Sequence, residues 1–93
     1  MAVRFYIDSL TGFPHIYGHD VTESEVEDVM RAPAEDRASA GNTRAAIGQT
    51  RGGRYLRVIY VPDSPQGSSF VITAYEVQGN PLAAFKRRRQ RKR

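Results

Sequence analysis

Two apolar runs in the second half of the chain constrain its fold more than any other feature. Residues 55–61 (YLRVIYV) and 69–77 (SFVITAYEV) are rich in β-branched and aromatic residues, a composition typical of strands. The segment 62–67 (PDSPQG) between them has the prolines and the glycine of a turn. Both runs have apolar residues at consecutive positions, which predicts strands covered on both faces. We therefore expect both strands to lie at the centre of a sheet.

Weaker patterns predict two further strands. Residues 3–8 alternate between apolar and polar, with Val3, Phe5 and Ile7 on one face. Residues 44–50 form a short run that ends at the hairpin signal Gly-Gly. Residues 9–20 contain several glycine and proline residues, and residues 33–43 (PAEDRASAGNT) are small and polar. We expect loops in both segments, with room for one extra helical turn in the second.

The start of a helix is marked near residue 22. Thr22 as N-cap and Glu25 three residues later predict a capping box, and Val21 with Val26 predicts a hydrophobic staple. A buried stripe is predicted at the helical spacing i, i+3 and i+4 by Val26, Val29 and Met30. Pro33 ends this helix or begins a short second one.

A last helix is predicted from Asn80 as N-cap with Pro81 at the first helical position. The element order is then β-α-β-β-β-α, which predicts an α+β fold with a mostly antiparallel four-stranded sheet and helices packed against it. A chain of 93 residues can form one hydrophobic core. We expect a single domain over residues 1–85, followed by a basic tail over residues 86–93.

The net charge of +4 is very unevenly distributed. The tail KRRRQRKR holds seven basic residues and no acid, whereas residues 1–85 hold seven basic and ten acidic residues. A basic run of this kind is an interaction arm or a solvated helix end, and we expect it to contact nucleic acid. Its candidate phosphate-binding residues are Lys86, Arg87, Arg88 and Arg89.

Composition excludes several classes of protein. The chain has no cysteine, so disulfide scaffolds, cysteine zinc fingers and thiol catalysis are excluded. No apolar run approaches the roughly 20 residues of a membrane span, and residues 1–10 (MAVRFYIDSL) do not read as a signal peptide. We expect a cytoplasmic protein with no membrane partner.

His15 and His19 are the two histidines of the chain, and histidine titrates near neutral pH. His19 is a candidate general base or acid, or else a structural histidine beside the first helix. The His-x-x-x-His spacing suggests a metal, but Pro14 and Gly18 oppose a helix that presents both rings, and no third ligand is evident. We therefore expect no metal and no cofactor.

Four arginines lie on or beside the predicted hairpin of residues 44–61: Arg44, Arg51, Arg54 and Arg57. They either bind phosphate or pair with the acidic first helix. Arg57 is of particular interest because it interrupts an apolar strand. Glu76 is either a catalytic base beside these arginines or an edge charge, and Tyr75 either stacks on a base or packs in the sheet.

Four segments resemble the BrnT-type branch of the RelE/ParE toxin superfamily, and resemble still more an uncharacterised sister family of BrnT. These segments are PHIYGHDVTE (14–23), IGQT (47–50), GRYLRVIY (53–60) and VITAY (71–75). The resemblance spans about residues 3–89. It departs from the family at Tyr75, where an arginine that holds the RNA phosphate is expected.

The resemblance implies a RelE-like fold and the toxin of a type II toxin–antitoxin pair. The implied activity is metal-independent cleavage of RNA, including ribosome-bound mRNA, by attack of a ribose 2′-hydroxyl on the adjacent phosphate. For this activity the candidate catalytic residues are Arg57, which would bind the phosphate, and His19 or Glu76, which would transfer the proton. The implied protein partner is a cognate antitoxin. The alternative is a non-catalytic RNA- or protein-binding module on the same fold, which the absent arginine favours.

Overall fold

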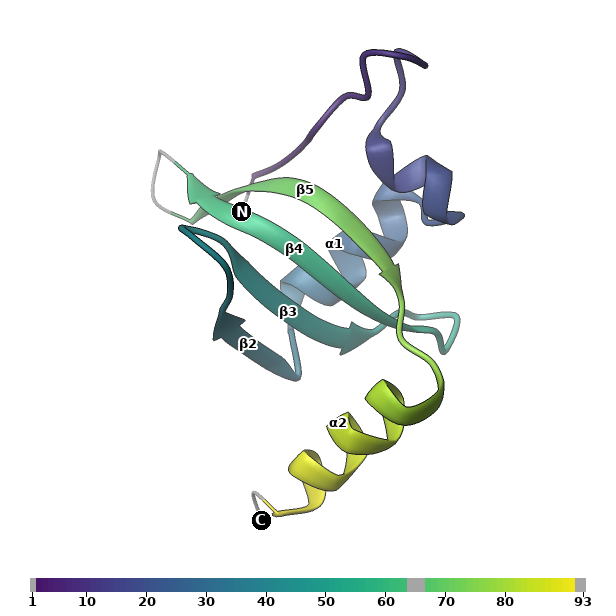
Figure 1. Cartoon of the computed structure of the whole chain (residues 1–93), viewed down its shortest axis with the longest axis vertical. Helices are drawn as coiled ribbons and strands as arrows, with labels where there is room; N and C mark the ends of the chain where they lie inside the picture. Colours follow the sequence, from purple (N-terminus) through teal and green to yellow (C-terminus); the bar gives the residue numbers. More distant parts are fainter. Residues whose placement is uncertain (1, 64–66, 92–93) are drawn as a thin grey trace.

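The computed structural model describes residues 2–63 and 67–91, and it has an α+β fold (Figure 1). Along the chain the elements are β1 (Val3–Phe5), the 3-10 helix η1 (His15–His19), α1 (Glu23–Arg31), β2 (Glu35–Ala38), β3 (Arg44–Gln49), β4 (Tyr55–Asp63), β5 (Ser68–Glu76) and α2 (Gly79–Arg91). The five strands form one sheet in the order β1-β5-β4-β3-β2. The α+β class is confirmed, while the prediction of four strands is wrong.

The centre of the sheet agrees with the sequence. β4 lies between β5 and β3, and both of these contacts are antiparallel. The two apolar runs therefore form strands with a neighbour on each side, as their composition predicted. Residues 64–66 of the predicted turn between them lie outside the described residues.

The strand that the sequence did not predict is β2. Residues 35–38 (EDRA) have neither β-branched nor aromatic residues, so they were expected in a loop. They pair antiparallel with β3, from Glu35 opposite Ile47 to Ala38 opposite Arg44. β2 lies at the edge of the sheet, where charged side chains are common because one side of the strand has no neighbouring strand.

The N-terminal segment also differs from its prediction. β1 ends at Phe5 and pairs parallel with β5, and Ile7 forms only an isolated bridge to Pro14, with 49% of its surface exposed. The chain leaves the sheet after Phe5, so the alternating pattern continues beyond the strand. The predicted loop of residues 9–20 contains η1, which is a single short 3-10 helix.

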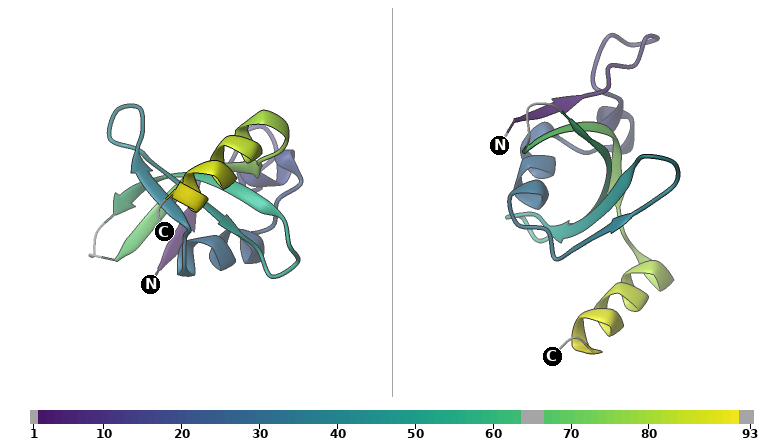
Figure 2. Two further views of the ribbon diagram at one scale, coloured as in Figure 1. Left: turned by 90° about the horizontal axis from the view of Figure 1, so that it is seen from below. Right: turned by 90° about the vertical axis from the view of Figure 1, so that its left-hand side faces the viewer.

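α1 covers one face of the sheet and forms the main core. The predicted capping box is present, with the Thr22 side chain accepting from the Glu25 backbone and the Glu25 side chain accepting from Thr22. The core consists of buried residues of η1, α1, the short segment between them and the central strands: Ile16, Val21, Val26, Val29, Met30, Ala46, Leu56, Val58, Tyr60, Val71 and Ala74. A Cβ on Gly48 would lie 3.1 Å from Val29 Cγ1, so glycine lets α1 approach β3 closely. Figure 2 (right) shows the sheet curved around α1.

α2 packs at one end of the sheet and on its other side. Phe85 and Leu82 of α2 contact a small apolar cluster that includes Ile47 and Val77. The helix begins at Gly79, one residue before the predicted N-cap, and continues through Arg91. Residues 86–91 of the basic tail are therefore helical, and residues 92 and 93 lie outside the described residues. No helix in the described part of the chain is long and apolar enough to cross a membrane.

Candidate functional site

Arg57 lies on the face of the sheet opposite α1. Along β4, Leu56 and Val58 are buried in the core under α1, so Arg57 between them points to the other face. There it is half-buried between its cross-strand partners, Ile47 on β3 and Tyr75 on β5. The strand thus presents one cation on a surface that is otherwise apolar and aromatic.

Two buried polar atoms on this face lack a hydrogen-bond partner within the described residues. The buried Nε of Arg57 has no hydrogen-bond partner within the described residues, and no carboxylate among them forms an ion pair with its guanidinium. The buried Oγ1 of Thr73 also has no partner. Thr73 is paired with Ile59, so it lies on the same face one strand away. Buried polar groups are normally hydrogen-bonded, so this pair is a candidate for contact with a ligand.

Rings from η1 and β5 extend this site toward the edge of the sheet. The centroid of the His19 ring is 6.1 Å from that of Tyr75, with an edge-on geometry. The His15 ring lies 5.4 Å from His19 and 6.1 Å from Tyr6. Because Tyr75 is the cross-strand partner of Arg57, the structure aligns an imidazole, a phenol and a guanidinium in one row. Of the predicted catalytic residues, it brings His19 and Arg57 to the same region.

Asp8 approaches the other histidine of this row. Its Oδ2 lies 3.4 Å from Nδ1 of His15. The backbone N–H of Leu10, and to a smaller extent His15, lowers the pKa of Asp8. In the described part of the chain, no group of three or more His, Cys, Asp or Glu side chains is arranged to hold a metal ion.

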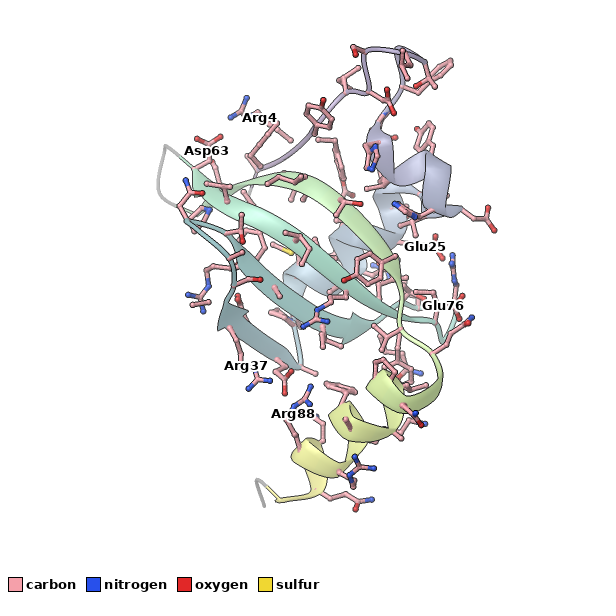
Figure 3. The ribbon with its side chains drawn as sticks, in the orientation of Figure 1. Arg4, Glu25, Arg37, Asp63, Glu76 and Arg88 are labelled. Atoms are coloured by element: carbon pink, nitrogen blue, oxygen red, sulfur yellow. The ribbon has the colours of Figure 1, made fainter. Side chains whose placement is uncertain are left out.

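Arg54 has the opposite environment to Arg57. Its Nη1 donates to both Glu25 oxygens at 2.9 and 3.0 Å and to the Asp20 carbonyl at 2.9 Å, and its Nη2 donates to Glu76 at 3.3 Å. The Glu25 hydrogen bond raises the pKa of Arg54. Figure 3 shows Glu25 and Glu76 at the same edge of the sheet. Arg54 thus fixes the end of η1 next to His19, and its donors are used within the protein.

Glu76 lies apart from Arg57. It is paired with Leu56, so it points to the α1 side of the sheet, whereas Arg57 points to the other. The structure therefore does not bring the three predicted catalytic residues together in one place.

Three more of the predicted phosphate-binding arginines have carboxylate partners. Arg44 donates to Asp36 at 2.9 Å, and Arg51 lies 3.4 Å from Asp28. Arg88 forms a two-pronged pair with Glu35 at 2.8 and 2.9 Å, which raises the pKa of Arg88. This pair joins α2 to β2, and Figure 3 shows Arg88 on α2 near Arg37 of β2.

Lys86 and Arg89 of α2 border a groove that the sequence did not predict. Arg87 is exposed, Lys86 Nζ lies 5.3 Å from the Tyr55 ring centroid, and Arg89 donates to the Ala34 carbonyl at 3.1 Å. The groove has a volume of about 310 Å³ and is lined by Ala34, Gln49, Tyr55, Phe85, Lys86, Arg89 and Gln90. No sequence signal marks it, because its walls come from segments distant in the chain.

Comparison with known proteins found no relative, since no family model, no curated protein and no solved structure matches this chain. The function of the protein is therefore inferred from the geometry of its site and from its sequence motifs.

Proposed function

We propose that this protein binds single-stranded RNA across the α2 side of its sheet and cleaves it without a metal, as a RelE/BrnT-like toxin would. The observation that carries the proposal is the half-buried guanidinium of Arg57, which has no carboxylate partner in the described residues and lies in a row with Tyr75 and His19. Four neighbouring arginines are neutralised by acids, so Arg57 stands out by its environment.

A phosphate satisfies the groups that the fold leaves open. Leaving a buried donor without an acceptor costs about 1–3 kcal/mol, and a phosphate oxygen removes that cost on binding. The planar guanidinium suits a phosphate because it can donate two parallel hydrogen bonds. Tyr75 beside it offers a ring on which a base can stack. Together these side chains fit an unpaired nucleotide better than they fit a rigid duplex.

The proposed reaction needs no co-reactant. His19 takes the proton of a ribose 2′-hydroxyl, the 2′-oxygen bonds to the adjacent phosphorus, and the bond to the 5′-oxygen breaks. The leaving 5′-oxygen takes a proton from water, and His19 returns the proton it accepted to water, so the products are a 2′,3′-cyclic phosphate and a 5′-hydroxyl. Arg57 stabilises the charge that develops on the phosphate. We assign proton transfer to His19 rather than Glu76, because Glu76 is held by Arg54 on the other side of the sheet.

A specific observation favours a second candidate, a non-catalytic RNA-binding module. Tyr75 occupies the place where the toxin family carries an arginine, and Glu76 is engaged in an ion pair. In this case Arg57 binds RNA and no bond is broken. If the protein is a toxin, it would bind an antitoxin protein in addition to RNA.

The experiment compares binding and cleavage of a single-stranded RNA oligonucleotide in the presence of EDTA. Arg57→Gln is expected to weaken binding and to reduce the dependence of log K on log salt by about 0.7, the contribution of one phosphate on a single strand. His19→Gln is expected to lower the cleavage rate at least about 10²-fold while binding is retained. Cleavage is measured from the appearance of 2′,3′-cyclic phosphate ends.

Arg51→Gln is the matched control, because the Arg51 side chain is 80% exposed and lies against Asp28. Equal RNA binding by wild type and Arg57→Gln, or no binding by the folded wild type, would rule out the proposal. Binding that depends on Arg57 with intact RNA would establish the second candidate.

A further inference from the structure

The groove between α2 and the sheet has a floor that suits a flat ligand. Tyr55 forms this floor and is held from one side by Phe85, whose ring centroid is 5.7 Å away at an interplanar angle of 60°. Phe85 is itself only 2% exposed, so it fixes the tyrosine ring. Lys86 Nζ lies over the Tyr55 ring at 5.3 Å from its centroid. A planar group that enters here meets an aromatic ring and a cation together.

The walls of the groove select for a polar or anionic ligand. Gln49 and Gln90 supply amides that can both donate and accept hydrogen bonds. Gln49 is held in place by donating from Nε2 to the Gly53 carbonyl at 3.2 Å. Lys86 and Arg89 add two cations, and the described lining contains no carboxylate. This composition favours an anion with an apolar flat face and disfavours a cation.

The size and position of the groove point to one nucleotide. A volume of about 310 Å³ is at the small end for ligand sites and too small for a helix of a partner protein. Tyr55 and Arg57 lie on the same face of β4 two residues apart, which separates their Cα atoms by about 7 Å. One nucleotide of an extended strand covers a distance of this order. A phosphate on Arg57 and a base on Tyr55 can therefore belong to the same RNA segment.

We infer that this groove is a binding site for one unpaired nucleobase of a single-stranded RNA, with the base on Tyr55 and the adjoining phosphate near Lys86 and Arg89. The inference rests on the proposed function, because the strand is oriented by its phosphate contact with Arg57. It adds a base-binding subsite to that function, two residues from Arg57 along β4.

The test measures the affinity of single-stranded RNA by fluorescence anisotropy, using wild type, Tyr55→Leu and Tyr55→Phe. Removal of one stacking ring is expected to weaken binding about 5- to 100-fold, the range measured for single base–aromatic contacts. Tyr55→Phe keeps the ring and is expected to bind like wild type. Phe13→Leu is the matched control, since Phe13 is an aromatic residue with 60% of its surface exposed on a distant loop.

A second series uses RNA strands that lack one base at each position in turn. One abasic position is expected to weaken binding to wild type, and Tyr55→Leu is expected to cause no further loss with that strand. Circular dichroism checks that each variant is folded. Lys86→Gln changes an exposed residue at the groove and is expected to reduce the affinity for RNA independently. Adenosine monophosphate in tenfold excess over the RNA is not expected to displace it, and displacement would reassign the groove to free nucleotides.

The outcomes separate this inference from the proposed function. RNA binding that depends on Arg57 but is unchanged by Tyr55→Leu and Lys86→Gln would overturn the inferred base-binding site. It would leave the proposed function standing. Absence of RNA binding by the folded wild type would overturn both.

Discussion

Arg54 and Arg57 lie three residues apart on one hairpin and have opposite roles. Arg54 is bound by two carboxylates and a carbonyl at the α1 side of the sheet. Arg57 emerges on the other side, where its Nε has no partner in the described residues. The α1 side thus satisfies its arginine with internal contacts, whereas the α2 side leaves two buried polar atoms without a partner in the described residues. The side of the strand, rather than the residue type, decides whether an arginine here is engaged in internal ion pairs.

The largest expected effect is on the α1 side. Leu56→Ala removes a side chain that is 0% exposed in the core under α1. We expect the free energy of unfolding to fall by about 2–5 kcal/mol, the usual cost of such a cavity. Urea denaturation measures it, and a loss below about 1 kcal/mol would contradict a closely packed α1 side.

Arg54→Met is expected to lower the free energy of unfolding by a smaller amount. It leaves Glu25 and Glu76 without their shared cation, and we expect a loss of about 1–2 kcal/mol at pH 7, because these groups are partly exposed to solvent. Arg51→Met, at an exposed pair on the same hairpin, serves as the control and is expected to change stability little.

The stability difference between wild type and Arg54→Met should become smaller at low pH. Bonding to the Thr22 backbone N–H, and then to Arg54, lowers the pKa of Glu25 below its ordinary value of 4.5. The resulting stabilisation is complete above that value and is lost as the pH falls through the lower pKa of the folded state. We therefore expect the difference between wild type and Arg54→Met to shrink below about pH 4.5. A difference that is constant from pH 7 to pH 3 would disprove the ion-pair explanation.

The smallest expected effect on stability is that of Arg57→Leu. Leucine fits beside Ile47 and Tyr75, and it removes a buried donor that has no partner in the described residues. We expect the free energy of unfolding to stay within about 0.5 kcal/mol of wild type or to rise, because no favourable pair is lost. A loss above 1 kcal/mol, measured by urea denaturation, would mean that Arg57 is structural like Arg54.

The sequence predicted those parts of the fold that local patterns determine. The capping box at Thr22 and Glu25, and the central position of the two apolar runs, depend on neighbours in sequence and were confirmed. β2 was missed because its pairing with β3 depends on backbone hydrogen bonds and on contacts such as that of Arg44 with Asp36. Such contacts have no local pattern.

The candidate site was predictable in its residue types and less so in its grouping. Arg57 could be chosen as a candidate site residue because a charge within an apolar strand is unusual. Among the described residues Arg54 has carboxylate partners and Arg57 has none. This difference depends on strand register, which the sequence does not specify. The groove at Tyr55 depends on how α2 docks, so its residues could not be grouped in advance.

The pairing of β1 with β5 has a consequence for how the protein forms. Val3 is held opposite Ser69, so β1 can pair in the sheet only after β5 has been synthesised. The β2-β3-β4 meander joins near neighbours and can form earlier, because closing a short loop loses less entropy. Until β5 arrives, β1 has no partner strand in this sheet. We expect a mutation in β1 to act mainly on the final step of assembly, long after the hairpin that carries Arg57 has formed.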